Sequence, residues 1–280
     1  MKTFALALGS GGARGLAHVA VLEALDEMGV KPTVIAGASI GALIGAAYAA
    51  GMRGRDIRHY VLTLAHSPGE IRRRLVASRA GTFAHLLSGA FSRATQLDAE
   101  KFCAQFLPQA VPGDFAALQI PLIVMTTDLH RRQEAPQSSG PLHRAVAASI
   151  AIPGLFRPVL ADGRVLIDGG TTNPLPYDTL FGRGDVVLAV DVFGIPAVER
   201  ADMPGTWEAV YTTILVMGGA ILAAKLAHAQ PDILIRPNVT TFRTLDFYQA
   251  SSIMRTADAV KKEVKEKLAA LLGVNVTAAP

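Results

Sequence analysis

Residues 34–50, VIAGASIGALIGAAYAA, decide the fold. The stretch opens with an apolar run, Val34–Ala36, turns at small residues, and continues from Ile40 to about Ala50 as an apolar segment of helical length. A buried strand that passes through so short a turn into a helix is the local pattern of a parallel α/β sheet. The turn itself, Gly37-Ala38-Ser39-Ile40-Gly41, matches G-x-S-x-G in the strand–turn–helix setting of a nucleophile elbow.

This setting favours Ser39 as a nucleophile. The sharp turn pushes its hydroxyl out of the chain, and the small residues Gly37 and Gly41 let strand and helix approach each other. The helix N-terminus then favours negative charge that develops beside the serine. A G-x-S-x-G sequence also arises by chance in a chain rich in Gly and Ala, but its place between a strand and a helix favours the functional interpretation.

The rest of the chain repeats the strand–helix alternation. A strand over residues 3–8 leads through glycines into a helix over 16–28, which Gly29 and Pro32 end. We predict one α/β domain spanning residues 1–280, with a central, mostly parallel sheet flanked by helices. Its motif-bearing part is about 3–192, and a C-terminal strand and helices occupy about 204–272. Further strands are expected at 122–127, 165–167, 185–192 and 232–236, and further helices within 53–118, at 142–149 and at 247–271.

Composition excludes some classes of protein. Of the 280 residues, 50% are hydrophobic and 18% are charged, which is too much charge for a polytopic membrane protein. The formal charge of +4 can favour anionic surfaces, but few residues are aromatic and no basic run is interleaved with aromatics, so nucleic acid is not an expected partner. The single cysteine, Cys103, is expected to be a buried thiol in a reducing, cytoplasmic compartment.

Two stretches invite a membrane interpretation. The first residues, MKTFALALGSGG, imitate a signal peptide, but their apolar run is short and fits a first strand better. Residues 209–224 are weakly polar yet shorter than the roughly 18 to 20 residues of a membrane span, so no transmembrane segment is expected. A core helix is favoured, and an acyl channel or lid and a membrane contact are the alternatives. A basic cluster, Arg72, Arg73, Arg74 and Arg79, could contact an anionic membrane peripherally, although a solvated helix face is the favoured interpretation.

A glycine-rich loop, Gly9-Ser10-Gly11-Gly12-Ala13-Arg14-Gly15, lies between the first strand and its helix. Backbone N–H groups in such a loop, beside the positive end of a helix, suit an oxyanion or a phosphate. No Gly-Lys-Ser/Thr follows, so the loop is not a P-loop. The G-x-G-x-x-G spacing fails at Ser10, and no acidic residue stands about 20 positions on, which argues against a nucleotide-binding Rossmann protein.

A nucleophilic serine needs a base. None of the seven histidines has the expected position: His228 sits at helical spacing, and His18 is a helix-packing residue. The remaining candidate is Asp168, which ends a strand in VLIDGGTTNPLP and is followed by Gly169 and Gly170. A carboxylate is a weak base, with an ordinary pKa of about 3.9. Asp168 could still accept the Ser39 proton at hydrogen-bond distance in a dry site.

Taken together, these segments resemble the bacterial patatin-like phospholipases, in the family's order and over most of residues 3–192. The resemblance implies a three-layer patatin-like fold, and the tail from about Trp207 is only loosely similar. The segments that carry it are GSGGARGLAHVAVLEAL from Gly9, GASIGALIGAAYAAG from Gly37, TTDLHRRQ from Thr126, AVAASIAIPGLFRPV from Ala145 and DGGTTNPLP from Asp168.

The resemblance also implies a function. It implies a Ser39–Asp168 dyad without histidine, an oxyanion hole from the Gly11 and Gly12 amides, and Arg14 as support for that loop. The expected activity is acyl-ester hydrolysis on phospholipids, lysophospholipids or related lipids, with no cofactor and no metal. Ser10 stands where the common family pattern has glycine. The alternative is a catalytically weak patatin-like protein with a regulatory or adaptor role; nothing in the sequence indicates the oligomeric state.

Overall fold

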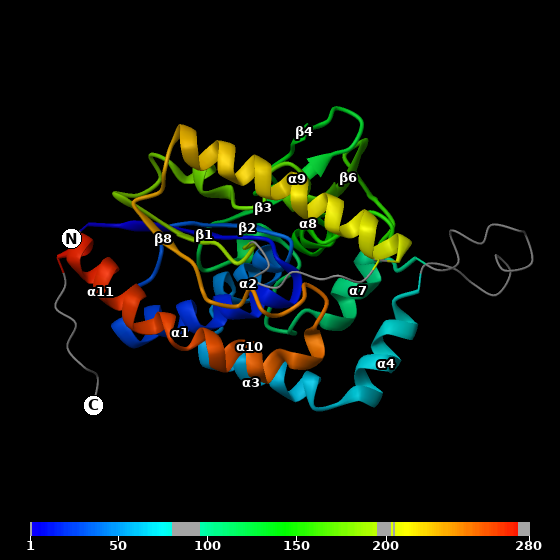
Figure 1. The fold of residues 1–280 in the computed structure, drawn as a ribbon, viewed down its shortest axis with the longest axis horizontal. Coiled ribbons are helices and arrows are strands. Elements are labelled where there is room, and N and C mark those ends of the chain that lie inside the picture. Colours follow the sequence, from blue (N-terminus) through cyan, green and yellow to red (C-terminus); the bar gives the residue numbers. More distant parts are fainter. Residues whose placement is uncertain (1, 80–95, 195–202, 204, 274–280) are drawn as a thin grey trace, which may run out of the picture.

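The computed structural model describes residues 2–79, 96–194, 203 and 205–273, and its strands form one mixed sheet (Figure 1). The strand order is β5-β6-β3-β2-β1-β7-β8, with β4 paired to β3 outside this order. The α/β fold predicted from the sequence is confirmed. Parallel pairing joins β1 (Phe4–Leu8), β2 (Ile35–Ala38), β3 (Leu122–Asp128), β7 (Val186–Val190) and β8 (Ile233–Ile235), whereas β4 (Gln133–Glu134), β5 (Val159–Ala161) and β6 (Arg164–Asp168) pair antiparallel.

Strand β1 shows why the two faces of the sheet are covered differently. Phe4, Leu6 and Leu8 belong to the larger apolar core, whereas Ala5 and Ala7 belong to a second core on the other face. Successive side chains of a strand point to opposite faces, so one face carries large residues and the other small ones. The large residues pack with α1 (His18–Met28), α2 (Ile40–Ala49), α10 (Ala250–Ala257) and α11 (Val260–Leu272). The small residues leave room for η4 (Pro176–Leu180) and α9 (Thr206–His228), which completes three layers.

The described part of the region 53–118 is mostly helical. It holds α3 (Gly54–Ala65), α4 (Pro68–Ala77) and α7 (Ala99–Phe106), followed by the short turn η2 (Phe115–Ala117). On α4, Arg73 and Arg74 form ion pairs with Glu70 on the same helix, as expected of a solvated face. Cys103 on α7 is buried, and burial raises the pKa of its thiol.

The predicted helix over 247–271 is divided in the structure. Its residues form the short turn η5 (Phe247–Gln249), then α10 and α11. The apolar residues of this stretch still pack together, because Ile253, Met254, Val264 and Leu268 are all buried in the larger core. The chain bends between Ala257 and Val260 without interrupting that contact.

The structure corrects the prediction that residues 209–224 form a core helix. The helix is longer, Thr206–His228, and over Ala209–His228 only 11% of it is buried. One side packs on the sheet through Leu215, Leu222 and Leu226, and the opposite side is exposed. Because residues 209–224 carry no charge on either side, their pattern could not separate the two faces. By length and by a mean hydropathy of 1.7 alone, this helix could cross a membrane; in the structure it lies across the sheet (Figure 1).

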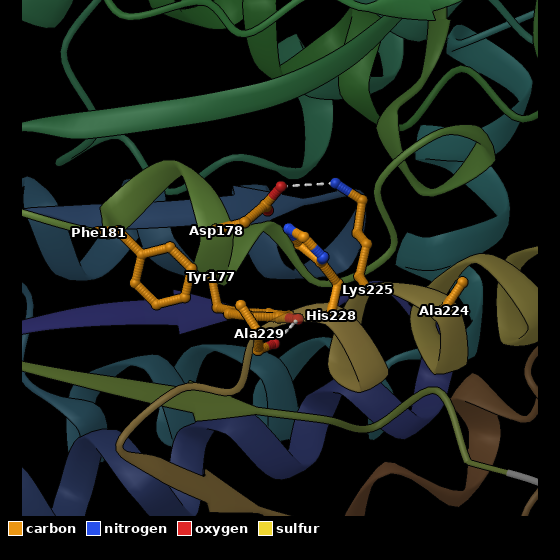
Figure 2. A pocket seen from close by; sticks show the side chains of 7 residues that line it. All are labelled: Tyr177, Asp178, Phe181, Ala224, Lys225, His228 and Ala229. Carbon is orange, nitrogen blue, oxygen red and sulfur yellow. Dashed lines mark hydrogen bonds and ion pairs between the residues drawn. The ribbon is translucent and has the colours of Figure 1, made fainter.

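The C-terminal end of α9 is tied to the domain by charged and polar contacts. Lys225 Nζ lies 2.6 Å from Asp178 Oδ2 and 2.8 Å from Glu134 Oε1, and the Tyr177 hydroxyl donates to the Ala229 carbonyl at 2.7 Å (Figure 2). In the middle of the helix, a Cβ added to Gly218 would lie only 2.7 Å from the Phe193 ring. These contacts hold α9 on the face of the sheet that carries Ala5 and Ala7.

Candidate active site

Ser39 occupies a strained turn between β2 and α2. Its φ of 54° lies in the left-handed region, which a non-glycine residue adopts at a cost of about 1–3 kcal/mol. A side chain at Gly41 would collide with the Leu8 carbonyl oxygen, and one at Gly37 would lie 2.6 Å from the Gly41 carbonyl oxygen. Both glycines are therefore needed for the close approach of strand and helix.

A second serine, Ser149, supports the turn at Ser39 through a hydrogen bond. The Ser39 N–H donates a hydrogen bond to Ser149 Oγ at 2.9 Å, and that hydroxyl donates to the Met125 carbonyl at 2.7 Å. Ser149 is the last residue of α8 (Leu142–Ser149) and is fully buried. Sequence reasoning missed this residue, because a serine in an apolar helix gives no sign of which backbone group it will bind.

Sheet register brings Asp168 to Ser39. Ala38 on β2 pairs with Met125 on β3, and the next β3 residue, Thr126, pairs with Asp168 at the end of β6. Ser39, the residue after Ala38, is therefore level with Thr126 and meets Asp168 across β3. Ser39 Oγ donates to Asp168 Oδ2 at 2.6 Å, and the Gly170 N–H, within η3 (Gly169–Thr171), donates to Asp168 Oδ1 at 2.7 Å.

Both side chains of this pair are almost hidden from solvent, each being 6% exposed. Burial raises the pKa of Asp168 to about 6, while the hydrogen bonds from Ser39 and Gly170 act in the opposite direction. The carboxylate is therefore a stronger base than an ordinary aspartate, yet it is still largely ionised at neutral pH. Such a group, in direct contact with a serine hydroxyl, can accept its proton.

The glycine-rich loop faces the same place from the end of β1. The N–H groups on either side of Gly11 and Gly12 donate hydrogen bonds within the protein. Ser10 N donates to the Pro174 carbonyl at 2.7 Å, and Ala13 N donates to the Thr244 carbonyl at 2.7 Å. Within the described part of the chain, the N–H groups of Gly11 and Gly12 have no such acceptor. Gly12 has a φ of 57°, and a side chain there would collide with Thr244. The two free donors border the same cavity as Ser39.

Arg14 joins this loop to two distant segments. Its side chain is buried, and it donates from Nε to the Phe242 carbonyl at 2.8 Å and from Nη1 to the Phe193 and Gly194 carbonyls at 2.7 and 3.3 Å. Burial lowers the pKa of the Arg14 guanidinium, and an arginine in a protein keeps its charge. Arg14 lies in η1 (Gly12–Ala17), so its three carbonyl partners fix the start of that turn.

We call the space in front of Ser39 the Ser39 cavity. Its volume is about 30 Å³, and it is lined by Ser39, Asp168, Gly170 and the residues of the glycine-rich loop. Helix α9 closes it with Tyr211, Ile214 and Leu215. Burial raises the pKa of Tyr211, so its phenol is neutral. Sequence reasoning left open whether this stretch lines the pocket, because the contact joins residues far apart in the chain.

Histidines and metal sites are the other usual elements of hydrolase sites. His18 is fully buried; its Nε2 lies 2.8 Å from the Gly9 carbonyl oxygen, and burial lowers its pKa to about 4, so the ring is neutral. Within the described residues, no histidine lines the Ser39 cavity and no group of His, Cys, Asp and Glu is arranged to hold a metal ion. A larger, open pocket of about 530 Å³ beside Tyr177 and Lys225 contains neither Ser39 nor Asp168 (Figure 2).

Known proteins resemble this chain at both the sequence and the fold level. The family model "Patatin-like phospholipase" matches residues 6–181. An uncharacterized NTE family protein of Mycobacterium tuberculosis is 39% identical over 199 residues, which are 71% of this chain and 51% of that protein. The lysophospholipase nte1 of Aspergillus niger is 30% identical over an alignment of 291 positions, which covers 95% of this chain and 18% of that protein.

Among solved structures, VipD from Legionella pneumophila has a similar fold. The TM-score is 0.50 at 16% identity, covering 95% of this chain and 66% of that one. At this identity the likeness concerns the fold alone. The chain spans about half the length of the mycobacterial relative and under a fifth of the fungal one.

Proposed function

The chain belongs to the patatin-like phospholipase family, and from this premise we propose that it is a serine lipid acyl hydrolase. Its substrates are carboxylic esters of phospholipids, lysophospholipids or related lipids. Ser39 is the nucleophile and Asp168 the proton acceptor, and the amides of Gly11 and Gly12 form the oxyanion hole. Arg14 supports the loop that carries those amides.

Acylation is the first step. Ser39 Oγ attacks the ester carbonyl carbon while its proton passes to Asp168 Oδ2. The negative charge that develops on the carbonyl oxygen is stabilised by the Gly11 and Gly12 N–H groups. When the tetrahedral intermediate collapses, the bond to the leaving oxygen breaks, and Asp168 returns the proton to the departing alcohol. The acyl group is then esterified to Ser39.

Deacylation repeats the sequence with water. A water molecule attacks the acyl carbon and gives a proton to Asp168, and the same two amides again bind the oxyanion. The Ser39–acyl bond breaks, Asp168 returns the proton to Ser39 Oγ, and a fatty acid leaves. Both halves need only groups of this chain and water.

The observation that carries the proposal is the 2.6 Å hydrogen bond between Ser39 Oγ and Asp168 Oδ2. It is made beside a cavity bordered by the N–H groups of Gly11 and Gly12, for which the described part of the chain provides no acceptor. Its test is labelling with an active-site fluorophosphonate together with turnover of p-nitrophenyl esters and lysophosphatidylcholine. We expect wild type to be labelled, and Ser39→Ala to lose labelling and about a thousandfold or more of its turnover. Unchanged activity in Ser39→Ala would refute the assignment.

A matched control is available in Ser78→Ala. Ser78 is also a buried serine, but its hydroxyl donates to the Arg74 carbonyl on α4, away from the Ser39 cavity. This variant should be labelled and turn over ester as wild type does. If wild type itself is neither labelled nor active on any ester, the alternative of a catalytically weak regulatory or adaptor protein takes precedence.

The proposal extends to where the protein works. We place it in the cytoplasm, in peripheral contact with the inner face of the membrane, where its lipid substrates reside. A single cysteine, buried at Cys103, suits a reducing compartment. Cell fractionation in a low-salt buffer should recover part of the protein with membranes.

A further inference from the structure

Two segments border the Ser39 cavity, a third touches its glycine-rich loop, and each of the three carries exposed apolar side chains. Residues 152–157 line the cavity with Ile152 and expose Leu155; α9 lines it with Ile214. The third segment, 242–249, touches Gly12 through Thr244. We call the exposed large apolar residues of these segments the apolar rim; its members are Leu155, Val210, Val216, Met217, Leu245, Phe247 and Tyr248.

The part of the rim on α9 forms a face of its own. Val216 is 67% exposed and Met217 52%, and the helix continues this side with small residues through Ala220, Ala223 and Ala224. Its other side packs on the domain, with Gly218 against Phe193 and Lys225 paired with Asp178 and Glu134. An exposed helix face with no charge over sixteen residues fits hydrocarbon better than water.

Within residues 152–157, 209–224 and 242–249, the exposed charges have one sign. The exposed charged residues are Arg157 and Arg243, and no described residue forms an ion pair with either. The acid of these stretches, Asp246, is buried and accepts from the Arg243 N–H and the Gln249 side chain. Two cations beside an apolar face complement anionic head groups above acyl chains.

We propose that the apolar rim, with Arg157 and Arg243, is a docking surface for an anionic phospholipid bilayer. This inference rests on the proposed function, because docking brings the Ser39 cavity to its lipid substrate. It also places the outer side of α9 in the acyl region, while Arg157 and Arg243 contact phosphates. Helix α9 lies in the interface rather than across it, because Lys225 and Leu222 hold its inner side on the domain.

The test is co-sedimentation with vesicles of phosphatidylcholine, with and without phosphatidylglycerol, using the Ser39→Ala protein so that no lipid is hydrolysed. Adding Val216→Asp and Met217→Asp should weaken binding at least about tenfold, since each side chain leaves hydrocarbon as a charge. The matched control is Leu160→Asp, because Leu160 on β5 is 68% exposed but outside the rim. Equal binding of the rim and control variants would overturn the proposal, and so would absent binding by the parent.

Charge is tested in the same assay. Arg157→Glu with Arg243→Glu should remove the extra binding that phosphatidylglycerol confers, whereas Arg72→Glu with Arg255→Glu should preserve it.

A gain-of-signal variant guards against misfolding: Val216→Trp should bind more tightly, and its emission should shift to the blue on vesicles. Binding that is insensitive to phosphatidylglycerol, or an unshifted spectrum, refutes the anionic docking surface. None of these readouts requires ester hydrolysis, so failure of the proposed activity remains distinguishable.

A separate observation concerns Ser10. Ser10 is 5% exposed and lines the Ser39 cavity, and its buried hydroxyl has no hydrogen-bond partner within the described residues. A buried hydroxyl without a partner costs about 1–3 kcal/mol, so a partner is expected when the site is filled. We infer that Ser10 Oγ donates to the carbonyl oxygen of the bound ester, beside the Gly11 and Gly12 amides.

Replacing Ser10 tests this inference. Ser10→Ala and Ser10→Gly should lower kcat by about tenfold or more with little change in KM, because the donor acts on charge that develops in the transition state. Their thermal unfolding temperatures should equal or exceed that of wild type, since an unpaired buried hydroxyl is removed. Unchanged kcat would overturn the inference, and so would a loss of stability that accounts for the lost activity.

Discussion

Ser39 Oγ donates a 2.6 Å hydrogen bond to Asp168 Oδ2 and thereby joins two residues that are 129 positions apart in the chain. Each stands at the end of its strand, and β3 lies between the two strands. The contact therefore depends on the register of three strands rather than on any local motif. It places a serine hydroxyl against a carboxylate whose other oxygen is held by the Gly170 N–H.

The first prediction concerns Asp168→Asn, which should lose activity and gain stability. Asparagine cannot accept the serine proton, so turnover should fall by about a thousandfold or more. In the folded state the pKa of Asp168 is about 6, above the ordinary value of about 3.9, so folding favours the protonated form. The contribution of protonated Asp168 to the stability of the folded state is complete below pH 4 and is lost as the pH rises through 6.

Asparagine stays neutral and escapes that loss. At pH 8 the variant should be more stable than wild type by up to about 3 kcal/mol, and at pH 4 the two should be alike. Urea unfolding at both pH values measures the difference. A variant that is less stable than wild type at pH 8 would contradict the assigned burial of the carboxylate.

The second prediction concerns pH dependence. If ionised Asp168 is the base, kcat/KM should rise with pH through a single ionisation near 6 and then stay level through the neutral range. The neutral His18 ring, with its pKa lowered to about 4, adds no step there. The rate of hydrolysis at each pH is measured by chromatography of the released fatty acid, because the signal of a coloured pH indicator would itself change with pH. A second ionisation near pH 7 would indicate a histidine in the mechanism.

Much of the site's backbone was predictable from sequence, because it depends on local patterns. The strand–turn–helix around Ser39 follows from an apolar run, glycines and a helical stretch, and the glycine-rich loop follows in the same way. The order of motifs then indicated Asp168 as the partner. The short antiparallel strands β4 and β5 could not be predicted, because two- or three-residue strands carry no periodic pattern.

Helix α9 could not be placed by sequence for a different reason. Residues 209–224 are apolar on all sides, and such a segment normally reads as core. Only the three-dimensional structure shows that Ile214 closes the Ser39 cavity while Val216 faces outward. Similarly, Ser149 supports Ser39 through a hydrogen bond across 110 positions, and no local pattern encodes such a contact.

The third prediction tests the support given by Ser149. Ser149→Ala leaves the Ser39 N–H and the Met125 carbonyl without their partner in a buried place, which should cost about 1–3 kcal/mol. Because the Ser39 turn is strained, we also expect slower fluorophosphonate labelling. Ser78→Ala, the buried control, removes a bond within one helix and should leave the labelling rate unchanged. Equal labelling rates in both variants would argue against a role for Ser149 in holding the turn.

The fourth prediction concerns Arg14→Lys. A lysine keeps the charge but cannot donate in the directions of the Phe242, Phe193 and Gly194 carbonyls at once. We expect a loss of stability on the order of 2–3 kcal/mol, together with a lower kcat, because the loop that carries Gly11 and Gly12 is loosened. Arg131→Lys serves as control, since that side chain is 64% exposed. Wild-type stability in Arg14→Lys would show that one donor suffices.

The fifth prediction concerns acyl-chain preference. The Ser39 cavity is about 30 Å³, too small for a fatty acyl chain, and Leu215 of α9 is one of its walls. Leu215→Ala should therefore admit longer chains and raise the ratio of kcat/KM for long over short p-nitrophenyl esters about tenfold. Leu226→Ala is the matched control, because Leu226 packs on the same core from the same helix but does not line the cavity. It should lose comparable stability without changing the ratio. If both variants shift the ratio alike, the effect comes from loosening α9 as a whole, and Leu215 does not set the chain length.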